Sequence, residues 1–582
     1  MAKQVCGRGF VGVNRNRFLT IKFLRRWNLA CIDGVVGYTF NPIHISKMKK
    51  TAAVFLLAMI LAIMYFITYT RNTESYDQEA PKLKIADYIT NKNNPPKEVK
   101  FDPSDAKKYE KLIRPYTIAH DKNCVLTIPD NFIGFGDLPL RIPDRKELES
   151  LSVDVITCLY HRYVTTIQIF CGLKDRAGEV KRNGWYVCGD PAYSPKQNCA
   201  VFLSNKAFPE QTFSDDMKSR YKCRVYNTPL SSNHTLQSWI EQTNNTQGTV
   251  DVLTLSINST SELKIIDKMV RDDSVKKVRQ LLLELHFDPK TTDAEVYILL
   301  LERLRMLYSI GLRITWFDQL IHCATNKFNK CYAVYFIQPD LRDKSKGVAK
   351  VDLPSIDNIR KLNGNQIADL YFSYIETTQF FCQHILRIGR ITDGGWNVCH
   401  DQMLKMKSPC IVYSFGVFND LSFDDEVAAT YNCKVYAFDP TTPFDTHQHG
   451  PRVWFSRIGL GDSYRKFQAG YVAPLTQIRA KLNHQSEPIA ILKADIEGAE
   501  WSSVPNMINT HQLEDVSQLY LEFHGDGNTA NQLILLKMIH DAGFRIFWYH
   551  INPACTFNKS LLRRSRCQEV YFMNTKFKAK NS

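Results

Sequence analysis

Short apolar runs alternate with amphipathic stretches along the carboxyl-terminal half of the chain. They predict strands at 410–413, 434–438, 453–458, 490–494, 518–523, 545–549 and 569–573, and helices at 424–431, 499–509 and 528–542. Alternating strands and helices that end in a strand pair indicate an α/β fold with a doubly wound, mostly parallel sheet and an antiparallel edge. In such a sheet ligands bind at the carboxyl ends of the strands, near the point where strand order reverses.

This pattern occurs twice. The segments IQIFC, NGWYVCGD, TFSDDM and YKCRVY match TQFFC, GGWNVCHD, SFDDEV and YNCKVY, and LLLELHFD and GLRITWF match LYLEFHGD and GFRIFWY. Cys171, Trp185, Cys188 and Cys199 stand 211 positions before Cys382, Trp396, Cys399 and Cys410. We therefore expect two tandem domains of the same α/β fold, a first repeat over 116–345 and a second repeat over 346–582.

A different pattern precedes the repeats. Residues 51–70 are uncharged and overwhelmingly apolar, and as a helix they would span about 30 Å, enough to cross a bilayer. We expect a transmembrane signal anchor there, followed by a polar stem over 71–115. A cleaved signal peptide is the alternative, and Met48 is an alternative start.

The net charge of +15 is concentrated before this span, since residues 1–50 hold ten Lys and Arg against one acid. By the positive-inside rule this tail is cytoplasmic and both repeats are lumenal or extracellular, as in a type II protein of the endoplasmic reticulum or Golgi. The expected partner of the tail and span is therefore the lipid bilayer, and we expect no nucleic-acid binding.

Fourteen of the sixteen cysteines follow the span, in a compartment that permits disulfides. Six recur at matching places in each repeat, so we expect the same disulfides in both, with the connectivity left open. Cys124 and Cys158 stand outside the repeated set and are candidates to pair with each other. Four glycosylation sequons, at Asn233, Asn244, Asn258 and Asn558, fit the same orientation.

The candidate chemistry of the second repeat follows its predicted strands. The first strand leads into Ser414 and Gly416, where a glycine lets the backbone approach a ligand closely. The second leads into Asp439, an acid suited to both hydroxyls of a ribose, or to capping a turn.

The fourth predicted strand leads into the most specific motif, K-x-D-x-E-G-x-E. It contains Lys493, Asp495, Glu497 and Glu500. Acids at a helix start are ordinary and could account for Glu497 and Glu500, but they do not explain Lys493 and Asp495.

Further titratable residues follow the fifth strand. Glu522 and His524 are candidate general bases, although Glu284 and His286 stand at their places in the first repeat, which favours a role in the fold. His447 and His449 lack a matched acid pattern, so we expect no metal site.

These motifs, with GGWNVC, VYAFDP, RIGLGD and LKADIEGAEW, resemble the FkbM-type methyltransferases, in particular the animal methyltransferase-like single-pass membrane proteins. The resemblance implies a seven-stranded Rossmann-like sheet, S-adenosylmethionine as cofactor, and methyl transfer, often to an oxygen. It places Ser414 and Gly416 at the methionine end of the cofactor and Asp439 at its ribose. It places Asp495 near the reacting centre, with Glu497 and Glu500 at the same rim.

The first repeat lacks the proposed cofactor residues. The stretch 203–207 lacks a glycine, 227–229 lacks an acid, and 256–261 reads SINSTS opposite the D-x-E-G-x-E motif. We therefore expect a degenerate first repeat and an equipped second repeat that methylates a hydroxyl, such as one on a glycan. The alternative is an inactive binding or scaffolding protein that recognises a glycan or a partner.

Overall fold

The computed structural model describes residues 30–32, 35–37, 108, 142–179, 184–204, 211–227, 230, 235–243, 248–287, 293–320, 331–391, 393–468, 470–552, 555 and 564–578. The chain forms two compact units, Met1–Lys92 and Asn93–Ser582. In the first unit, β1 (Ala30–Ile32) and β2 (Val35–Gly37) form an antiparallel pair. The span predicted at 51–70 lies outside the described residues. Among the helices that are described, none has the length and apolar character to cross a membrane.

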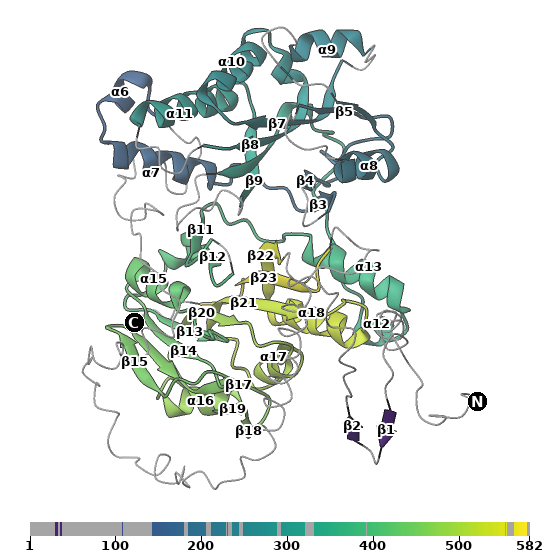
Figure 1. Cartoon of the computed structure of the whole chain (residues 1–582). Helices are drawn as coiled ribbons and strands as arrows, with labels where there is room; N and C mark the ends of the chain where they lie inside the picture. The colour runs from purple at the N-terminus through teal and green to yellow at the C-terminus, as the bar shows by residue number, and fades with distance from the viewer. Residues whose placement is uncertain are drawn as a thin grey trace, which may run out of the picture. The chain divides into compact units, whose positions relative to one another are not determined.

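Both repeats lie in the second unit (Figure 1). The elements of the first repeat are α6 (Arg145–Glu149), α7 (Val153–Val164), β3 (Lys174–Ala177), β4 (Trp185–Cys188), β5 (Ala200–Leu203), α8 (Gln211–Ser219), β6 (Arg224–Asn227), α9 (Leu236–Gln242), β7 (Val250–Ile257), α10 (Lys264–Arg271), β8 (Val278–Leu285), α11 (Ala294–Ser309), β9 (Arg313–Gln319) and β10 (Tyr332–Ile337). Its sheet has the order β6-β5-β7-β8-β10-β9, and β3 pairs with β4 in a separate hairpin.

The second repeat begins with α12 (Ile356–Ile359), α13 (Gly364–Ile375), β11 (Ile385–Ile388), β12 (Trp396–Cys399), α14 (His400–Met403), β13 (Ile411–Phe415), α15 (Ser422–Tyr431) and β14 (Lys434–Phe438). It continues with β15 (His447–Gly450), β16 (Val453–Ser456), β17 (Ile458–Leu460), β18 (Arg465–Phe467), β19 (Gly470–Ala473), α16 (Leu475–Lys481), β20 (Ile489–Ala494), α17 (Glu500–Asn509), β21 (Val516–His524), α18 (Ala530–Ala542), β22 (Phe544–Ile551) and β23 (Cys567–Asn574). Its large sheet has the order β15-β16-β14-β13-β20-β21-β23-β22.

The six-strand order of the first sheet is found again in the second, as β14-β13-β20-β21-β23-β22. The register also matches, because Val201 pairs with Val252 in one sheet and Val412 with Ile491 in the other. In both sheets the first four of these strands pair parallel, and the fifth strand pairs antiparallel with both of its neighbours, which confirms the predicted doubly wound arrangement with an antiparallel edge. The central strands are almost wholly buried, as in β20 and β21, because the faces of a largely parallel sheet are covered by the connecting helices.

The second sheet differs from the expected seven strands in having eight. The extra strand, β15, pairs antiparallel with β16. The single strand predicted over 453–458 is also wrong, because the chain leaves the large sheet after Ser456. From Ile458 it forms β17, which joins β18 and β19 in a separate three-stranded sheet.

The disulfides resolve the connectivity that the sequence left open. Cys171 pairs with Cys188 and Cys199 with Cys223, and the same pairs recur in the second repeat as Cys382–Cys399 and Cys410–Cys433. Cys555 pairs with Cys567. Cys158 and Cys331 are also disulfide-bonded, whereas Cys124 and Cys323 lie outside the described residues.

Candidate functional site

The chain of the second repeat reverses direction across its sheet between β13 and β20. From β13 it winds outward to β14, and it then crosses back to place β20 and β21 on the other side. Parallel pairing brings the carboxyl ends of these four strands to one edge, where a switch point of this kind forms a ligand crevice. The predicted site residues lie in the last residues of these strands or directly after them, so the fold brings them to the same edge.

Gly416 begins the turn after β13, where the backbone passes close to Asp495. Its φ is +75°, and a Cβ placed there would lie 1.6 Å from the carbonyl oxygen of Asp495. Only a residue without a side chain permits this approach of two backbones. Ser414, which lies in β13 two residues earlier, is fully buried.

Lys493 fastens this turn to β20. Its Nζ donates to the carbonyls of Phe415 at 3.1 Å and Gly416 at 2.9 Å, and it lies 5.2 Å from the centre of the Trp396 ring. Beside it, burial raises the pKa of Asp424 to about 7, against the opposing charge of Lys493 and the hydrogen bond from Ser414. The buried Lys493 and Asp424 thus form a polar support beneath the turn.

Asp439, after β14, organises the turns around it. Its Oδ2 accepts from the backbone N–H of Phe418 at 2.8 Å. Its Oδ1 accepts from the N–H and the hydroxyl of Thr441, at 2.7 and 2.6 Å. These are the contacts of a turn-capping aspartate, and they leave Oδ2 one further lone pair for a ligand.

The loop after β20 is held by Glu500 and presents Glu497. The fully buried Glu500 accepts from the N–H groups of Ile496 and Gly498, both at 2.8 Å, so it fixes the loop at the start of α17. Glu497, in contrast, has a left-handed backbone with φ of +53° and a side chain that is 86% exposed. Of the two acids, Glu497 is the one available to a ligand.

His524 lies among the carboxylates at the end of β21. Its Nε2 is 3.8 Å from Asp495 Oδ1 and 3.5 Å from Glu497 Oε2, and its Nδ1 is 3.5 Å from Glu500 Oε1. Burial alone would lower the pKa of His524, but the hydrogen bond with Glu500 and the surrounding carboxylates raise it above its ordinary value. The ring is therefore an imidazolium at neutral pH.

The carboxyl groups around His524 hold their protons more tightly than free ones do. Burial raises the pKa of Asp495 against the opposing charges of Lys493 and His524. Burial and the charges of Asp495 and Glu569 raise the pKa of Glu522. Three carboxyl groups, those of Asp495, Glu497 and Glu500, nevertheless surround the single imidazolium of His524, so the edge fits a cationic group better than a phosphate.

The same cluster has the composition of a cation site. One ligand atom from each of Asp495, Glu497 and His524 lies within 4.8 Å of the others, and carboxylate with imidazole ligands suits several divalent metals. His447 and His449 have other contacts, with the carbonyl of Asp445 and the carboxylate of Asp425.

In the first repeat the equivalent positions form a closed set of contacts. The sheet register aligns Ser256, Glu284 and His286 with Asp495, Glu522 and His524. Ser256 donates to Glu284 at 2.9 Å, and His286 lies 2.8 Å from the same carboxylate. Because these groups satisfy one another, Glu284 and His286 serve the fold there.

Three contributors to the second site were not assigned from the sequence. Asp424 supports the turn that Lys493 holds. The sequence signal that could have identified it is that the first repeat has Ser214, which carries no charge, at the aligned position. Asn552 donates to Glu522 at 3.1 Å, and Trp501 donates to the carbonyl of His524 at 3.0 Å. Asn552 directly follows β22 and Trp501 lies in α17, and only folding brings these two segments to the edge.

Comparisons with known proteins match the second repeat to methyltransferases. Residues 317–572 match the family model described as a methyltransferase domain. The chain is 26% identical over 238 residues to the protein named "Probable methyltransferase-like protein 24" of Homo sapiens, a match that covers 36% of this chain and 64% of that protein. The rat protein of the same name is 26% identical over 241 residues, covering 36% of this chain and 66% of the relative. The chain therefore spans just under two thirds of each relative.

Among solved structures, the fibrillarin pre-rRNA processing protein of Methanococcus jannaschii aligns with a TM-score of 0.16 and 12% identity, over 28% of this chain and 83% of that one. A score this low carries no argument about this chain. The matched range 317–572 contains Ser414, Gly416, Asp439, the acidic loop, Glu522 and His524. The candidate site thus lies within the part of the chain that matches a methyltransferase domain.

Proposed function

We propose that the second repeat is an S-adenosylmethionine-dependent methyltransferase that methylates a hydroxyl, such as one on a glycan, and that the first repeat is a pseudo-domain. The observation that carries this proposal is the acidic edge around Asp495 and His524, at the switch point of a methyltransferase domain. The equivalent edge of the first repeat is closed by its own hydrogen bonds. The matching strand order and disulfides of the two halves support a tandem duplication. The FkbM-type assignment stays a prediction.

The residues present fit the cofactor by charge and by space. S-adenosylmethionine carries a sulfonium and an ammonium, which the carboxylates of Asp495 and Glu497 favour electrostatically. The side-chain-free Gly416 permits close approach to the turn after β13. The remaining acceptor capacity of Asp439 Oδ2 can take one ribose hydroxyl.

When bound, the cofactor supplies a methyl group already activated by its sulfonium, so the protein has to align the acceptor and remove its proton. The His524 imidazolium cannot take that proton. It lies beside Asp495 and favours the ionised carboxylate. Asp495 is therefore the proton acceptor of this proposal, while Glu522, held by Asn552, tunes its charge.

Calorimetry with S-adenosylmethionine and the purified full chain tests the cofactor. The wild type is expected to bind one equivalent, and Asp495→Asn is expected to weaken binding by about tenfold or more, the effect of losing one charged contact. Ser256→Ala, at the equivalent place in the first repeat, is the matched control and leaves binding unchanged. A folded wild type that gives no binding heat would favour the inactive binding or scaffolding protein.

A second measurement tests the acceptor. Glycans from cells that make the wild type are expected to carry a methyl group absent from cells that make Asp495→Asn, as read by mass spectrometry. Glycans that match between the two would exclude glycan methylation while leaving the cofactor result intact.

The membrane anchor at 51–70 and the lumenal placement of both repeats belong to the same proposal. Asn258 tests them, because it lies in a sequon and is exposed. Treatment with an endoglycosidase is expected to shift the mobility of the wild type by one glycan more than that of Asn258→Gln. An identical shift would count against lumenal placement.

A further inference from the structure

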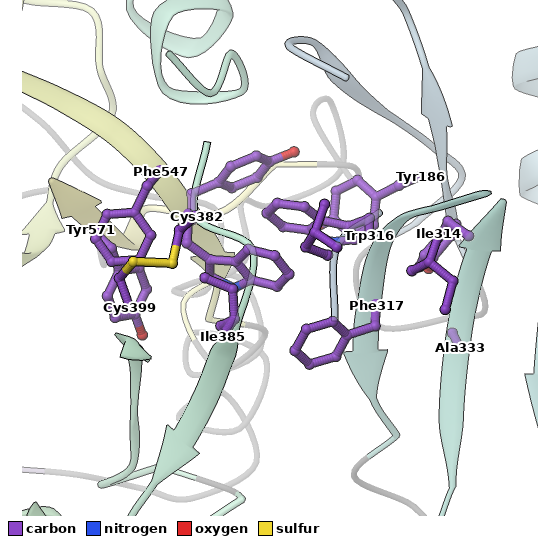
Figure 2. Close-up of a cluster of buried hydrophobic side chains, with 14 of the residues drawn as sticks. Tyr186, Ile314, Trp316, Phe317, Ala333, Cys382, Ile385, Cys399, Phe547 and Tyr571 are labelled. Carbon is purple, nitrogen blue, oxygen red and sulfur yellow. A yellow bond between two sulfur atoms is a disulfide. The ribbon is translucent and has the colours of Figure 1, made fainter. Parts of the chain in front are cut away.

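The two repeats meet at a buried aromatic cluster to which both contribute (Figure 2). Figure 2 shows Tyr186, Trp316 and Phe317 of the first repeat facing Cys382, Ile385 and Phe547 of the second. Trp316 stacks on Trp548 with ring centres 3.4 Å apart and an interplanar angle of 12°. Stacked aromatic pairs of this kind stabilise a contact beyond the effect of their buried area. The cluster therefore holds the repeats together.

The backbone contacts across this interface are symmetric. Replacing each residue by its equivalent in the other repeat turns one contact into another that is also present. Thr166 forms a β-bridge with His384, and Leu173 forms one with Thr377. At the offset of 211, Thr166 corresponds to Thr377 and Leu173 to His384, so each bridge is the image of the other.

The hydrogen bonds beside these bridges follow the same rule. The N–H of Ile167 donates to the carbonyl of Gln383 at 2.7 Å, and the N–H of Thr378 donates to the carbonyl of Gly172 at 2.9 Å. Ile167 corresponds to Thr378 and Gly172 to Gln383. The bridges and the hydrogen bonds that form them thus obey one two-fold relation.

Two further pairs join a residue to its own counterpart. Trp316 of GLRITWF meets Trp548 of GFRIFWY, and Phe170 meets Phe381 edge to face at 6.2 Å. A residue can contact its own equivalent only near a two-fold axis. This pattern of exchanged and self-matched contacts is the defining property of an isologous interface.

We propose that the interface between the repeats is a homodimer interface held within one chain, in which the first repeat occupies the place of a second subunit. The face of each repeat is complementary to itself, so the partner that fits it is another copy of the same fold. This assigns a role to a first repeat that lacks the candidate site: it covers the apolar face of the second.

The two repeats do not carry identical side chains at this interface, and the difference at Lys174 sets a preference among pairings. Lys174 is buried at the interface, where its Nζ donates to Thr378 Oγ1 and lies 4.6 Å from the centre of the Trp316 ring. The second repeat has Ile385 at this place. Two first repeats would bury two amines, whereas two second repeats would bury none, so the second repeat is the one that self-pairs more readily.

The interface also reaches the candidate site through β22, and this part rests on the proposed function. Tyr549 on β22 donates from its hydroxyl to the carbonyl of Lys174 at 2.7 Å. Three residues later, Asn552 donates to Glu522. By holding β22, the first repeat positions Asn552 and therefore Glu522.

A cleavable full-length chain tests the interface. A protease sequence inserted between Lys346 and Gly347 lies in an exposed segment, where no atom is within 4 Å of a Cβ built on Gly347. After cleavage, the two halves are expected to co-elute with the mass of the intact chain in size exclusion with light scattering. Halves that separate at micromolar concentration would overturn the proposal.

Substitutions in the cleaved chain test the symmetry. Trp316→Ala is expected to raise the dissociation constant of the halves about tenfold or more, as for a central aromatic anchor. Leu404→Ala, at an exposed side chain, is the matched control and leaves the dissociation constant unchanged. An unchanged constant in Trp316→Ala would overturn the proposal.

Trp316→Glu places a charge against Trp548 and should release the carboxyl-terminal half, which then pairs with itself. Light scattering is expected to show a dimer of that half, and adding Trp548→Glu is expected to make it monomeric. A released half that is folded by circular dichroism and monomeric would contradict the self-complementary face. These readouts are masses, so they test the interface even if the chain binds no S-adenosylmethionine. Absence of cofactor binding would contradict only the proposed link to Glu522.

Discussion

Gly416 lies where the backbone after β13 passes directly against the backbone after β20. Its missing side chain and its positive φ are separate requirements, and Gly498 separates them, since it also has a positive φ, +96°, but nothing within 4 Å of a built Cβ. A glycine turn was a weak indication in the sequence, and the contact with Asp495 is what gives this glycine its specific role.

We predict that Gly416→Ala lowers the free energy of unfolding by more than about 3 kcal/mol, because strain adds to a clash with backbone. Gly498→Ala is expected to cost only about 1 kcal/mol, from strain alone. Denaturant unfolding of both variants measures the difference. Equal losses would show that the approach of Gly416 to Asp495 has no energetic weight.

Asp424 is a residue whose ionisation the fold opposes. Because burial raises its folded pKa to about 7 from an ordinary value of 3.8, the folded state binds the proton more tightly than the unfolded state. The stability from this group is full below pH 3.8 and is lost as the pH rises toward 7.

We predict that Asp424→Asn removes this dependence. Between pH 5 and pH 8 the wild type should lose roughly 2–3 kcal/mol relative to the variant, from the size of the pKa shift. Parallel unfolding curves at the two pH values check this. Curves whose separation stays constant between pH 5 and pH 8 would contradict it.

The turn after β13 is the element that distinguishes the second repeat from the first. Lys493 and Asp424 support it, and the register and alignment place Thr254 and Ser214 at their positions in the first repeat. The first repeat therefore shows which residues the same strands accept when the turn has no such support.

We predict that Lys493→Thr costs roughly 3 kcal/mol, because it leaves the Asp424 carboxylate buried without its cationic neighbour. The double variant Lys493→Thr, Asp424→Ser should recover most of that stability, since it reproduces the pair found in the first repeat. S-adenosylmethionine binding should stay lost in both variants, because the carbonyls of Phe415 and Gly416 are no longer held. Recovery of binding in the double variant would show that the support is not part of the site.

The whole second unit depends on how the two repeats meet, and Lys174 makes that contact sensitive to pH. Burial lowers the pKa of Lys174 to about 7. Here the unfolded state binds the proton more tightly, so stability rises with pH above 7 and is lost as the pH falls through it.

We predict that the wild type gains roughly 2 kcal/mol relative to Lys174→Met between pH 7 and pH 9. Differential scanning calorimetry of the two chains measures this difference. A difference that does not change over this range would show that the Lys174 amine is not desolvated at the interface.

The amino-acid pattern alone determined the α/β class, the approximate strands and helices, the duplicated pattern and the edge where the site lies. These depend on local periodicity and on short motifs such as K-x-D-x-E-G-x-E, which the chain presents directly. It also separated a first repeat without the candidate cofactor residues from a second repeat that has them, because equivalent positions can be compared without coordinates.

Tertiary structure decided which atoms meet. In the folded chain the carboxylates of Asp439 and Glu500 accept hydrogen bonds from the backbone of turns. Asn552 holds Glu522, and Trp316 stacks on Trp548, although these partners are far apart in the chain. Disulfide partners and the departure of β17 from the large sheet were open for the same reason. Local preference constrains each segment separately, whereas the register of the sheet and the packing of the two repeats are set by contacts that no single segment contains.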